Sequence, residues 1–215
     1  MLIDIEGTDG SGKAIQTKLL CDYLIGKGYK CCLISFPNYA SRSSDPVKMY
    51  LGGEVGDDAN CLDGYQASAL YAVDRLITMK KIDLSQYDYV IFDRYTPSNI
   101  IHQSTRIEDQ KELNNFLDWI DEFEFGKMAL PRPDRILFLD MPPKYSIQLA
   151  RSRSDLKNGQ TKDILEADSS HLSKAYDRAV YVSERFGWTR IDCIRDERIK
   201  SIEDIHEEIK ASLNL

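Results

Sequence analysis

A glycine-rich segment close to the N-terminus has the residue types and spacing of a phosphate-binding loop. Residues 7–13 read Gly-Thr-Asp-Gly-Ser-Gly-Lys, the pattern G-x-x-x-x-G-K, between an apolar segment and a helical pattern. Glycines let the backbone curl until successive N–H groups point at phosphate oxygens, and the terminal lysine reaches the β- and γ-phosphates. In this context a chance glycine-rich turn is the weaker interpretation. The residues expected to bind a nucleoside triphosphate are Gly7, Thr8, Asp9, Gly10, Ser11, Gly12, Lys13 and Ala14.

The loop departs from the usual pattern at its last position. A Ser or Thr normally follows the lysine and offers a hydroxyl to Mg²⁺, but here the residue is Ala14. Mg²⁺ keeps several waters and needs only one or two carboxylates beside the phosphates, so a water can take the vacant place. The alternative is a protein that binds nucleotide and turns it over poorly, and the sequence leaves both open.

A second pair of candidate residues, Asp93 and Arg94, lies where the apolar segment 89–93 ends. An aspartate at the end of a buried strand is typical of a metal ligand, which makes Asp93 a candidate for Mg²⁺. Arg94 beside it has a guanidinium fork that can bind a second phosphate group, although a surface arginine is the simpler interpretation. Two phosphate-binding centres on one sheet edge predict transfer between phosphates. A phosphate monoester is already ionised at pH 7, so such an acceptor needs positioning and charge neutralisation and no general base.

Short apolar segments alternate with longer helical patterns, which predicts the elements that position these residues. Strands are expected at 2–6, 30–35, 89–93, 135–140 and 189–194. Helices are expected at 13–26, 64–81, 98–103, 110–125, 143–153, 169–186 and 201–213. The alternation predicts an α/β fold in one domain over residues 1–215: a doubly wound, five-stranded parallel sheet of the P-loop NTPase type, flanked by helices. The polar segments 37–64 and 154–168 are expected to be loops.

Composition limits the classes of partner. The chain has 215 residues and a formal net charge of −7, which argues against the broad basic face of a nucleic-acid or membrane-surface binder. No apolar segment approaches the ~20 residues of a membrane span. Five cysteines form no C-x-x-C pair and are interpreted as reduced packing residues, so the expected location is cytoplasmic. His171 and His206 fall in charge-rich helical segments and are expected to be exposed.

Taken in order, these motifs resemble those of thymidylate kinases, in the P-loop nucleoside monophosphate kinase group. The resemblance extends over nearly the whole chain and rests on the glycine-rich loop, Phe36-Pro37, the segment 70–75 (Leu-Tyr-Ala-Val-Asp-Arg), Asp93-Arg94-Tyr95 with Ser98-Asn99, and a basic lid at about 151–168. It implies phosphorylation of dTMP to dTDP, with ATP as donor and Mg²⁺, by a homodimer that binds these small nucleotides. The helices at 64–81 and 110–125 carry enough apolar residues to share a dimer interface or to serve the internal core.

The resemblance also implies roles for particular residues. Tyr71, where the family usually has Phe, stacks on the base, and Arg75 and Asn99 contact it. Without the resemblance, Tyr71 and Arg75 would be interpreted as a half-buried aromatic beside a surface arginine. The substrate-binding residues implied are Asp9, Phe36, Tyr39, Tyr71, Arg75, Arg94, Asn99 and His102. The catalytic residues implied are Lys13, Arg94, Arg153 and Asp9, and the metal ligands are Asp9, Asp93 and Glu166.

The lid is expected to supply a catalytic arginine, because the P-loop has Gly10 where some family members have that arginine. Arg151 and Arg153 are the candidates and join the ATP-binding set; a solvated helix end is the simpler interpretation of this basic segment. His102 replaces a tyrosine that in many relatives crowds the ribose 2′ position. Together with Ala14 and Tyr71, it leaves two alternatives open: a kinase for another pyrimidine monophosphate, or a nucleotide-binding protein with impaired turnover.

Overall fold

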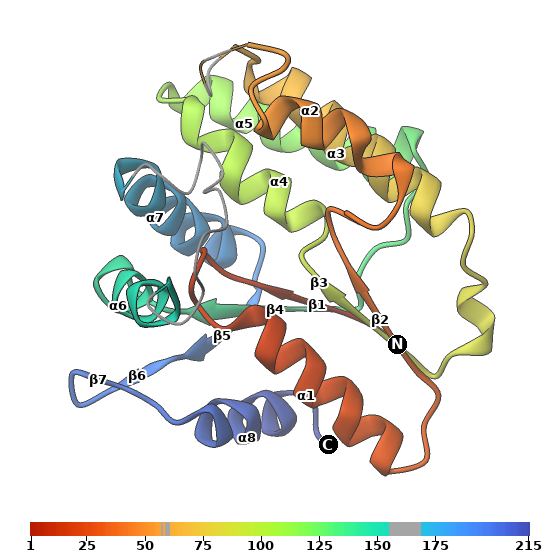
Figure 1. Ribbon diagram of the computed structural model, residues 1–215, viewed down its shortest axis with the longest axis vertical. Coiled ribbons are helices and arrows are strands. Elements are labelled where there is room, and N and C mark those ends of the chain that lie inside the picture. The colour runs from red at the N-terminus through yellow and green to blue at the C-terminus, as the bar shows by residue number, and fades with distance from the viewer. Residues whose placement is uncertain (57, 59–60, 155–168) are drawn as a thin grey trace.

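The computed structural model describes residues 1–56, 58, 61–154 and 169–215, with the backbone alone described at 150–154 and 169–170. Its centre is a parallel sheet of five strands in the order β2-β3-β1-β4-β5 (Figure 1). These strands are β1 (Leu2–Glu6), β2 (Cys31–Ser35), β3 (Tyr89–Asp93), β4 (Arg135–Asp140) and β5 (Thr189–Asp192). The predicted five-stranded parallel sheet is therefore confirmed.

Helices cover both faces of the sheet, as expected for parallel strands joined by crossover helices. In Figure 1, α1 and α8 lie against one face, and α3, α4, α5 and α7 lie on the other side. The helices are α1 (Lys13–Gly26), α2 (Asp45–Leu51), α3 (Gly64–Met79), α4 (Thr96–Gln103), α5 (Gln110–Asp121), α6 (Pro143–Ser154), α7 (Ser169–Arg185) and α8 (Ile202–Ser212). No helix in the described part of the chain is long and apolar enough to cross a bilayer.

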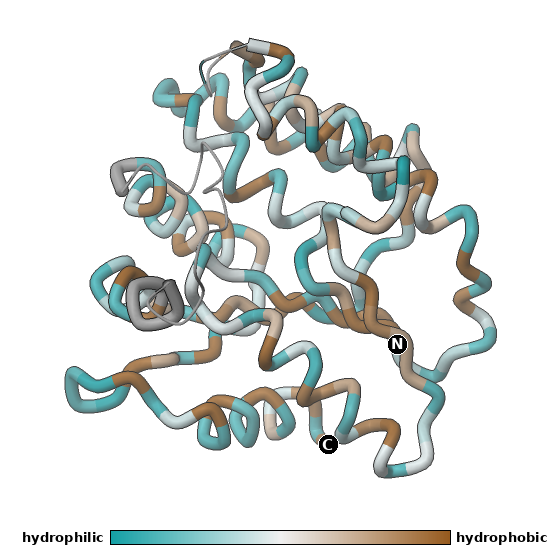
Figure 2. The backbone as a smooth tube through the Cα atoms, viewed as in Figure 1, coloured by the Kyte–Doolittle hydropathy of each residue, from teal (hydrophilic) through white to brown (hydrophobic). Residues whose placement is uncertain are grey.

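The central strand β1 separates an apolar face from a polar one. Ile3 and Ile5 are fully buried against α1 and α8, in a cluster that includes Leu24 and Ile209. Figure 2 shows the apolar character of the central strands. Because side chains alternate along a strand, Asp4 and Glu6 point to the opposite face, and both are also buried. Acidic groups are thus buried directly beneath the carboxyl edge of the sheet.

The structure corrects several predicted boundaries. The segment 37–64 contains a 3₁₀ turn at Arg42–Ser44 and then α2, which starts with a proline in its first turn. The predicted helix 110–125 is α only to Asp121 and continues as a π-helical turn, Glu122–Lys127. The last sheet strand ends at Asp192, and the chain then forms a small hairpin of β6 (Ile194–Arg195) and β7 (Arg198–Ile199). The expected loop at 154–168 falls outside the described residues from position 155 onward.

Candidate active site

The loop between β1 and α1 has the backbone conformation of a phosphate cradle. Gly10 and Gly12 adopt φ angles of 82° and 95°, in the left-handed region that side chains disfavour. A Cβ at position 10 would also lie 2.6 Å from the carbonyl oxygen of Ser146. The hydroxyls of Thr8 and Ser11 are buried and make no hydrogen bond within the described part of the chain. Inward-facing polar atoms of this kind fit a phosphate ligand, as the spacing predicts.

Lys13 folds back over this cradle. Its ammonium is almost fully buried and donates to the carbonyl oxygen of Thr8 at 2.8 Å. Burial and the neighbouring Arg94 lower the pKa of Lys13 to about 8, although Asp9 and Glu6 oppose the shift. Lys13 is therefore a cation whose charge is poorly compensated in the free protein, which favours the arrival of a polyanion.

Arg94 lies at the junction between this loop and the end of β3. Its φ is 69°, an uncommon conformation for a residue with a side chain and one often found at functional sites. The guanidinium forms an ion pair with Asp9 through Nη2, and Nη1 bonds His102 Nε2 at 2.9 Å. Glu6 holds the start of the following helix, because its carboxylate accepts from the backbone N–H of Tyr95 at 3.0 Å.

The charges around Arg94 fix the protonation of its neighbours. Burial raises the pKa of Asp9, but Arg94 and Lys13 outweigh burial and hold it well below its ordinary value. Burial and Arg94 lower the pKa of His102 to about 3. An arginine can only donate, so the His102 Nε2 atom accepts and the ring is neutral. At neutral pH the cluster therefore presents the arginine as its cation.

A cavity of about 380 Å³ opens beside Arg94. All eight residues predicted to bind substrate line it: Asp9, Phe36, Tyr39, Tyr71, Arg75, Arg94, Asn99 and His102. Asp93 lines it as well. The cavity runs from the phosphate loop to the side chains of α3 and α4, so it joins a phosphate-binding end to an aromatic, hydrogen-bonding end.

Two histidines that the sequence analysis expects to be exposed are half-buried, and one of them lines the cavity. His171, at the start of α7, was expected to be exposed, but it is half-buried and lines the cavity. Its ring stacks on that of His102, with centroids 5.9 Å apart and 21° between the planes. His206 is also half-buried and packs edge-on against Tyr23. The charge-rich sequence around both histidines does not reveal which helix face each occupies.

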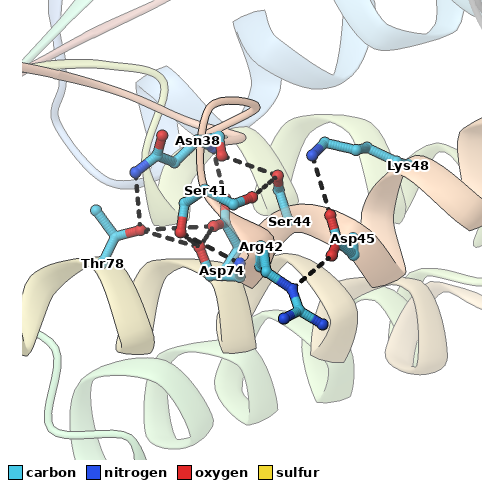
Figure 3. Close-up of polar contacts among 9 residues, drawn as sticks. Asn38, Ser41, Arg42, Ser44, Asp45, Lys48, Asp74 and Thr78 are labelled. Atoms are coloured by element: carbon cyan, nitrogen blue, oxygen red, sulfur yellow. Dashed lines mark hydrogen bonds and ion pairs between the residues drawn. The ribbon is translucent and has the colours of Figure 1, made fainter.

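A buried polar network attaches the segment that carries Tyr39 to α3 (Figure 3). One carboxylate oxygen of Asp74 accepts from the backbone N–H of Asn38 at 2.7 Å, and the other accepts from Ser43 Oγ at 2.6 Å. Ser44 Oγ donates to the carbonyl oxygen of Asn38 at 2.8 Å. Asp74 is 1% exposed. The segment from Asn38 to Ser44 is therefore fixed to the helix that also carries Tyr71 and Arg75.

Comparison with known proteins shows the family to which this chain belongs. The sequence matches the thymidylate kinase family over residues 5–209. The chain belongs to the thymidylate kinase family. It is 31% identical to the thymidylate kinase of Mycobacterium tuberculosis strain H37Rv over 172 residues, 79% of each chain. It is 33% identical to a probable thymidylate kinase of Pyrococcus horikoshii over 213 residues, 97% of this chain and 93% of the relative.

The fold is also that of a solved thymidylate kinase. The structure of the Candida albicans enzyme superposes with a TM-score of 0.73 and covers 99% of this chain and 90% of its own. Sequence identity between the two is 22%. At that identity the likeness concerns the fold, and it confirms the predicted α/β architecture.

Three residues predicted for the site, Arg151, Arg153 and Glu166, have side chains outside the described part of the structure. The backbone of Arg151 and Arg153 continues α6, but their side chains lie outside the described set. Glu166 lies outside the described residues altogether. Their assignment to ATP and metal therefore stays a prediction.

The two predicted metal ligands that the structure describes are Asp9 and Asp93. Among the described residues, no group of three or more His, Cys, Asp or Glu side chains is arranged to hold a metal ion. Asp9 and Asp93 do border the same cavity, and two carboxylates suffice for Mg²⁺ when phosphates and waters complete its shell. The donor set is therefore compatible with Mg²⁺ that arrives with a nucleotide.

Glu124 is a second residue that sequence reasoning missed, buried beside the cavity. It is fully buried and forms an ion pair with Arg75, which is itself 2% exposed. The interpretation of Arg75 as a surface arginine is therefore wrong. The available signal was a single acid between two aromatic residues, Phe123 and Phe125, within a predicted helix.

Proposed function

We propose that this member of the thymidylate kinase family transfers the γ-phosphoryl group of ATP to dTMP, with the two nucleotides end to end along the carboxyl edge of the sheet. The observation that carries this proposal is the cavity that begins at the phosphate loop and ends among Tyr71, Arg75 and Asn99. Family membership makes the protein a phosphotransferase acting on dTMP.

The proposed reaction needs no general base from the protein. An oxygen of the dTMP phosphate forms a bond to the γ-phosphorus of ATP while the bond to the β–γ bridging oxygen breaks, which yields dTDP and ADP. Lys13 and the loop N–H groups bind the donor phosphates. Arg94 binds the acceptor phosphate, and its contacts with Asp9 and His102 hold it in position. Catalysis then consists of alignment and charge neutralisation.

Two further groups complete the proposed site. Mg²⁺ held by Asp9 and Asp93 would neutralise phosphate charge. Arg153 or Arg151 in the lid, about residues 151–168, would add a cation when the lid closes over the donor, with Glu166 nearby as a third metal ligand. In this way the absence of a hydroxyl at Ala14 and of an arginine at Gly10 would be offset.

We also propose a homodimer in the cytoplasm. Leu70, Val73 and Ile77 share one face of α3, and Ile77 is 39% exposed although it is apolar. A second copy of the chain would cover this face. All five cysteines are free thiols, which fits a reducing compartment.

A coupled assay of ADP release tests the function directly. Purified protein with ATP and Mg²⁺ is offered dTMP, dUMP, UMP, CMP, AMP and GMP in turn. We expect the highest kcat/KM with dTMP. A higher kcat/KM with another pyrimidine monophosphate would change the substrate and keep the reaction class. Tight ATP binding with no turnover of any monophosphate would overturn the proposal.

A further inference from the structure

The carboxylate of Glu124 accepts four hydrogen bonds in the interior of the protein. Arg75 donates to it twice, from Nε at 2.7 Å and from Nη2 at 2.6 Å. Thr96 Oγ1 donates at 2.7 Å and Asn99 Nδ2 at 2.8 Å. Glu124 is 0% exposed, so these donors replace water completely. A buried carboxylate with its lone pairs filled in this way has a single permitted orientation.

The π-helical turn Glu122–Lys127 explains how an acid reaches this place. Phe123 packs on the cluster around Phe116 and Ile120, while Phe125 packs on a different cluster that includes Phe92. With both aromatic neighbours anchored, Glu124 between them is directed into the protein toward α3 and α4. The turn is a fixed support for this carboxylate.

Glu124 determines which edge of Arg75 is available to a ligand. The bidentate contact uses the side edge of the guanidinium, formed by Nε and one N–H of Nη2. Nη1 makes one long contact, to the carbonyl oxygen of Tyr95 at 3.4 Å. The edge formed by Nη1 and Nη2 therefore keeps N–H donors for a ligand, and Arg75 lines the cavity.

Glu124 also determines which end of the Asn99 amide is available. Asn99 Nδ2 donates to Glu124 and to the carbonyl oxygen of Ser68 at 3.1 Å. Both partners are acceptors, so the nitrogen must face them and the amide oxygen is left for a ligand. Asn99 lines the cavity together with Arg75. The pair thus offers a donor from one residue and an acceptor from the other.

We propose that Glu124 is the positioning residue that gives the cavity its base preference, an inference that rests on the proposed function. A donor beside an acceptor matches a base with a carbonyl oxygen next to a ring N–H, as in thymine and uracil. Cytosine has an amino group beside an unprotonated ring nitrogen, which is the reverse pattern. Sites built to hydrogen-bond a substrate reject the mismatched partner strongly, because buried polar groups are left unpaired.

The variant E124Q tests this role with little change of shape. Whichever way the new amide turns, its NH₂ group faces a donor: Arg75 Nε on one side, or Arg75 Nη2 and Asn99 Nδ2 on the other. At least one of the two base-contacting side chains must therefore reorient. We expect the ratio of kcat/KM for dTMP to that for dCMP to fall at least about tenfold, with dUMP affected like dTMP.

A conservative variant and a control make the result specific. E124D keeps an acceptor-only carboxylate at this position, so the N–H donors of Arg75 and Asn99 still face an acceptor. We expect E124D to keep the dTMP preference to within about threefold of the wild-type ratio. D121N removes a bidentate contact with Arg132 on the same segment, but at the surface, and should leave the ratio unchanged.

The outcomes separate this inference from the proposed function. If the wild-type protein does not phosphorylate dTMP, the function itself fails. If it does and folded E124Q keeps the wild-type ratio, or if E124D loses the dTMP preference as fully as E124Q, the role of Glu124 is overturned. Should E124Q not fold, E124D decides: a retained dTMP preference supports the role, and a lost one overturns it.

Discussion

Arg94 contacts groups from two different elements, Asp9 in the phosphate loop and His102 on α4. This position places the guanidinium between the loop proposed to bind the donor and the helix that borders the proposed acceptor cavity. When substrates bind, Arg94 must exchange Asp9 and His102 for phosphate oxygens. In the free protein, its contacts with Asp9 and His102 keep the guanidinium close to the position in which it binds phosphate.

The variant R94A should bind the acceptor dTMP much more weakly and bind the donor ATP about as tightly as the wild type. Charged hydrogen bonds contribute about 1.5–3 kcal/mol each, so we expect kcat/KM for dTMP to fall at least about a hundredfold. The Kd for ATP, measured by calorimetry, should stay within about threefold, because Lys13 and the loop N–H groups remain. If ATP binding weakens as much as dTMP binding, Arg94 does not belong to the acceptor side.

The lowered pKa of Lys13 predicts a pH dependence. The cation binds phosphate, and in the free protein its pKa is about 8, so the fraction that carries the charge falls as pH rises through that value. We therefore expect kcat/KM for ATP to decline above about pH 8. At saturating ATP the bound phosphates retain the proton on Lys13, so kcat/KM for dTMP should stay flat from about pH 7 to 9. A flat ATP profile to about pH 10 would contradict the assignment.

At the scale of elements, α3 carries residues that support two different parts of the cavity wall. Asp74 fixes the segment with Tyr39, and the next residue, Arg75, is fixed by the π-helical turn. Consecutive residues of a helix point about 100° apart, so one helix can hold two supports that do not touch.

Removing the Asp74 carboxylate should weaken both the stability of the protein and its binding of dTMP. D74A leaves the Asn38 N–H and Ser43 Oγ without their buried acceptor, which costs about 2–4 kcal/mol. For a chain of this size we expect a loss of roughly 5–12 °C in Tm, together with a higher KM for dTMP. The control R42A removes a side chain that is 99% exposed, and its Tm should match the wild type. Equal effects of the two variants would show that the network does not support the cavity.

The elements that sequence reasoning identified are those with strong local signals. The strands β1, β3 and β4 begin and end as predicted, because their apolar residues and flanking polar residues mark both limits. α2 was missed because its seven residues follow a serine-rich segment that looks like a loop. The environment of Arg75 was missed for a different reason: its partner lies 49 residues away, and no local pattern encodes that contact.

The same distinction applies to the candidate site. All eight predicted substrate residues line one cavity. Half of them, Asp9, Phe36, Tyr39 and Arg94, follow the carboxyl ends of parallel strands, which converge at one edge, and the other half lie on α3 and α4. His171 lines the cavity, and Glu124 contacts two side chains that line it, Arg75 and Asn99. Both residues come into place only through tertiary packing, so their sequence neighbourhoods gave weak or misleading signals.

At the scale of the whole molecule, the exposed apolar face of α3 predicts association. Sedimentation velocity should give twice the 24.6 kDa mass of the chain. The substitution I77E places a charge on that face and should shift the equilibrium to monomer. The matched control I25E lies on α1, on the opposite side of the sheet, where Ile25 is 54% exposed, and should leave the mass unchanged. A wild-type monomer, or a dimer insensitive to I77E, would rule out this interface.

The adjacency of Asp74 and Arg75 has a consequence for how the chain can vary. Inserting or deleting one residue in the first two turns of α3 would rotate everything beyond it by about 100°. Such a register shift would disengage both side chains in a single step. We therefore expect that length changes between the cap at Asp63 and Arg75 are not tolerated.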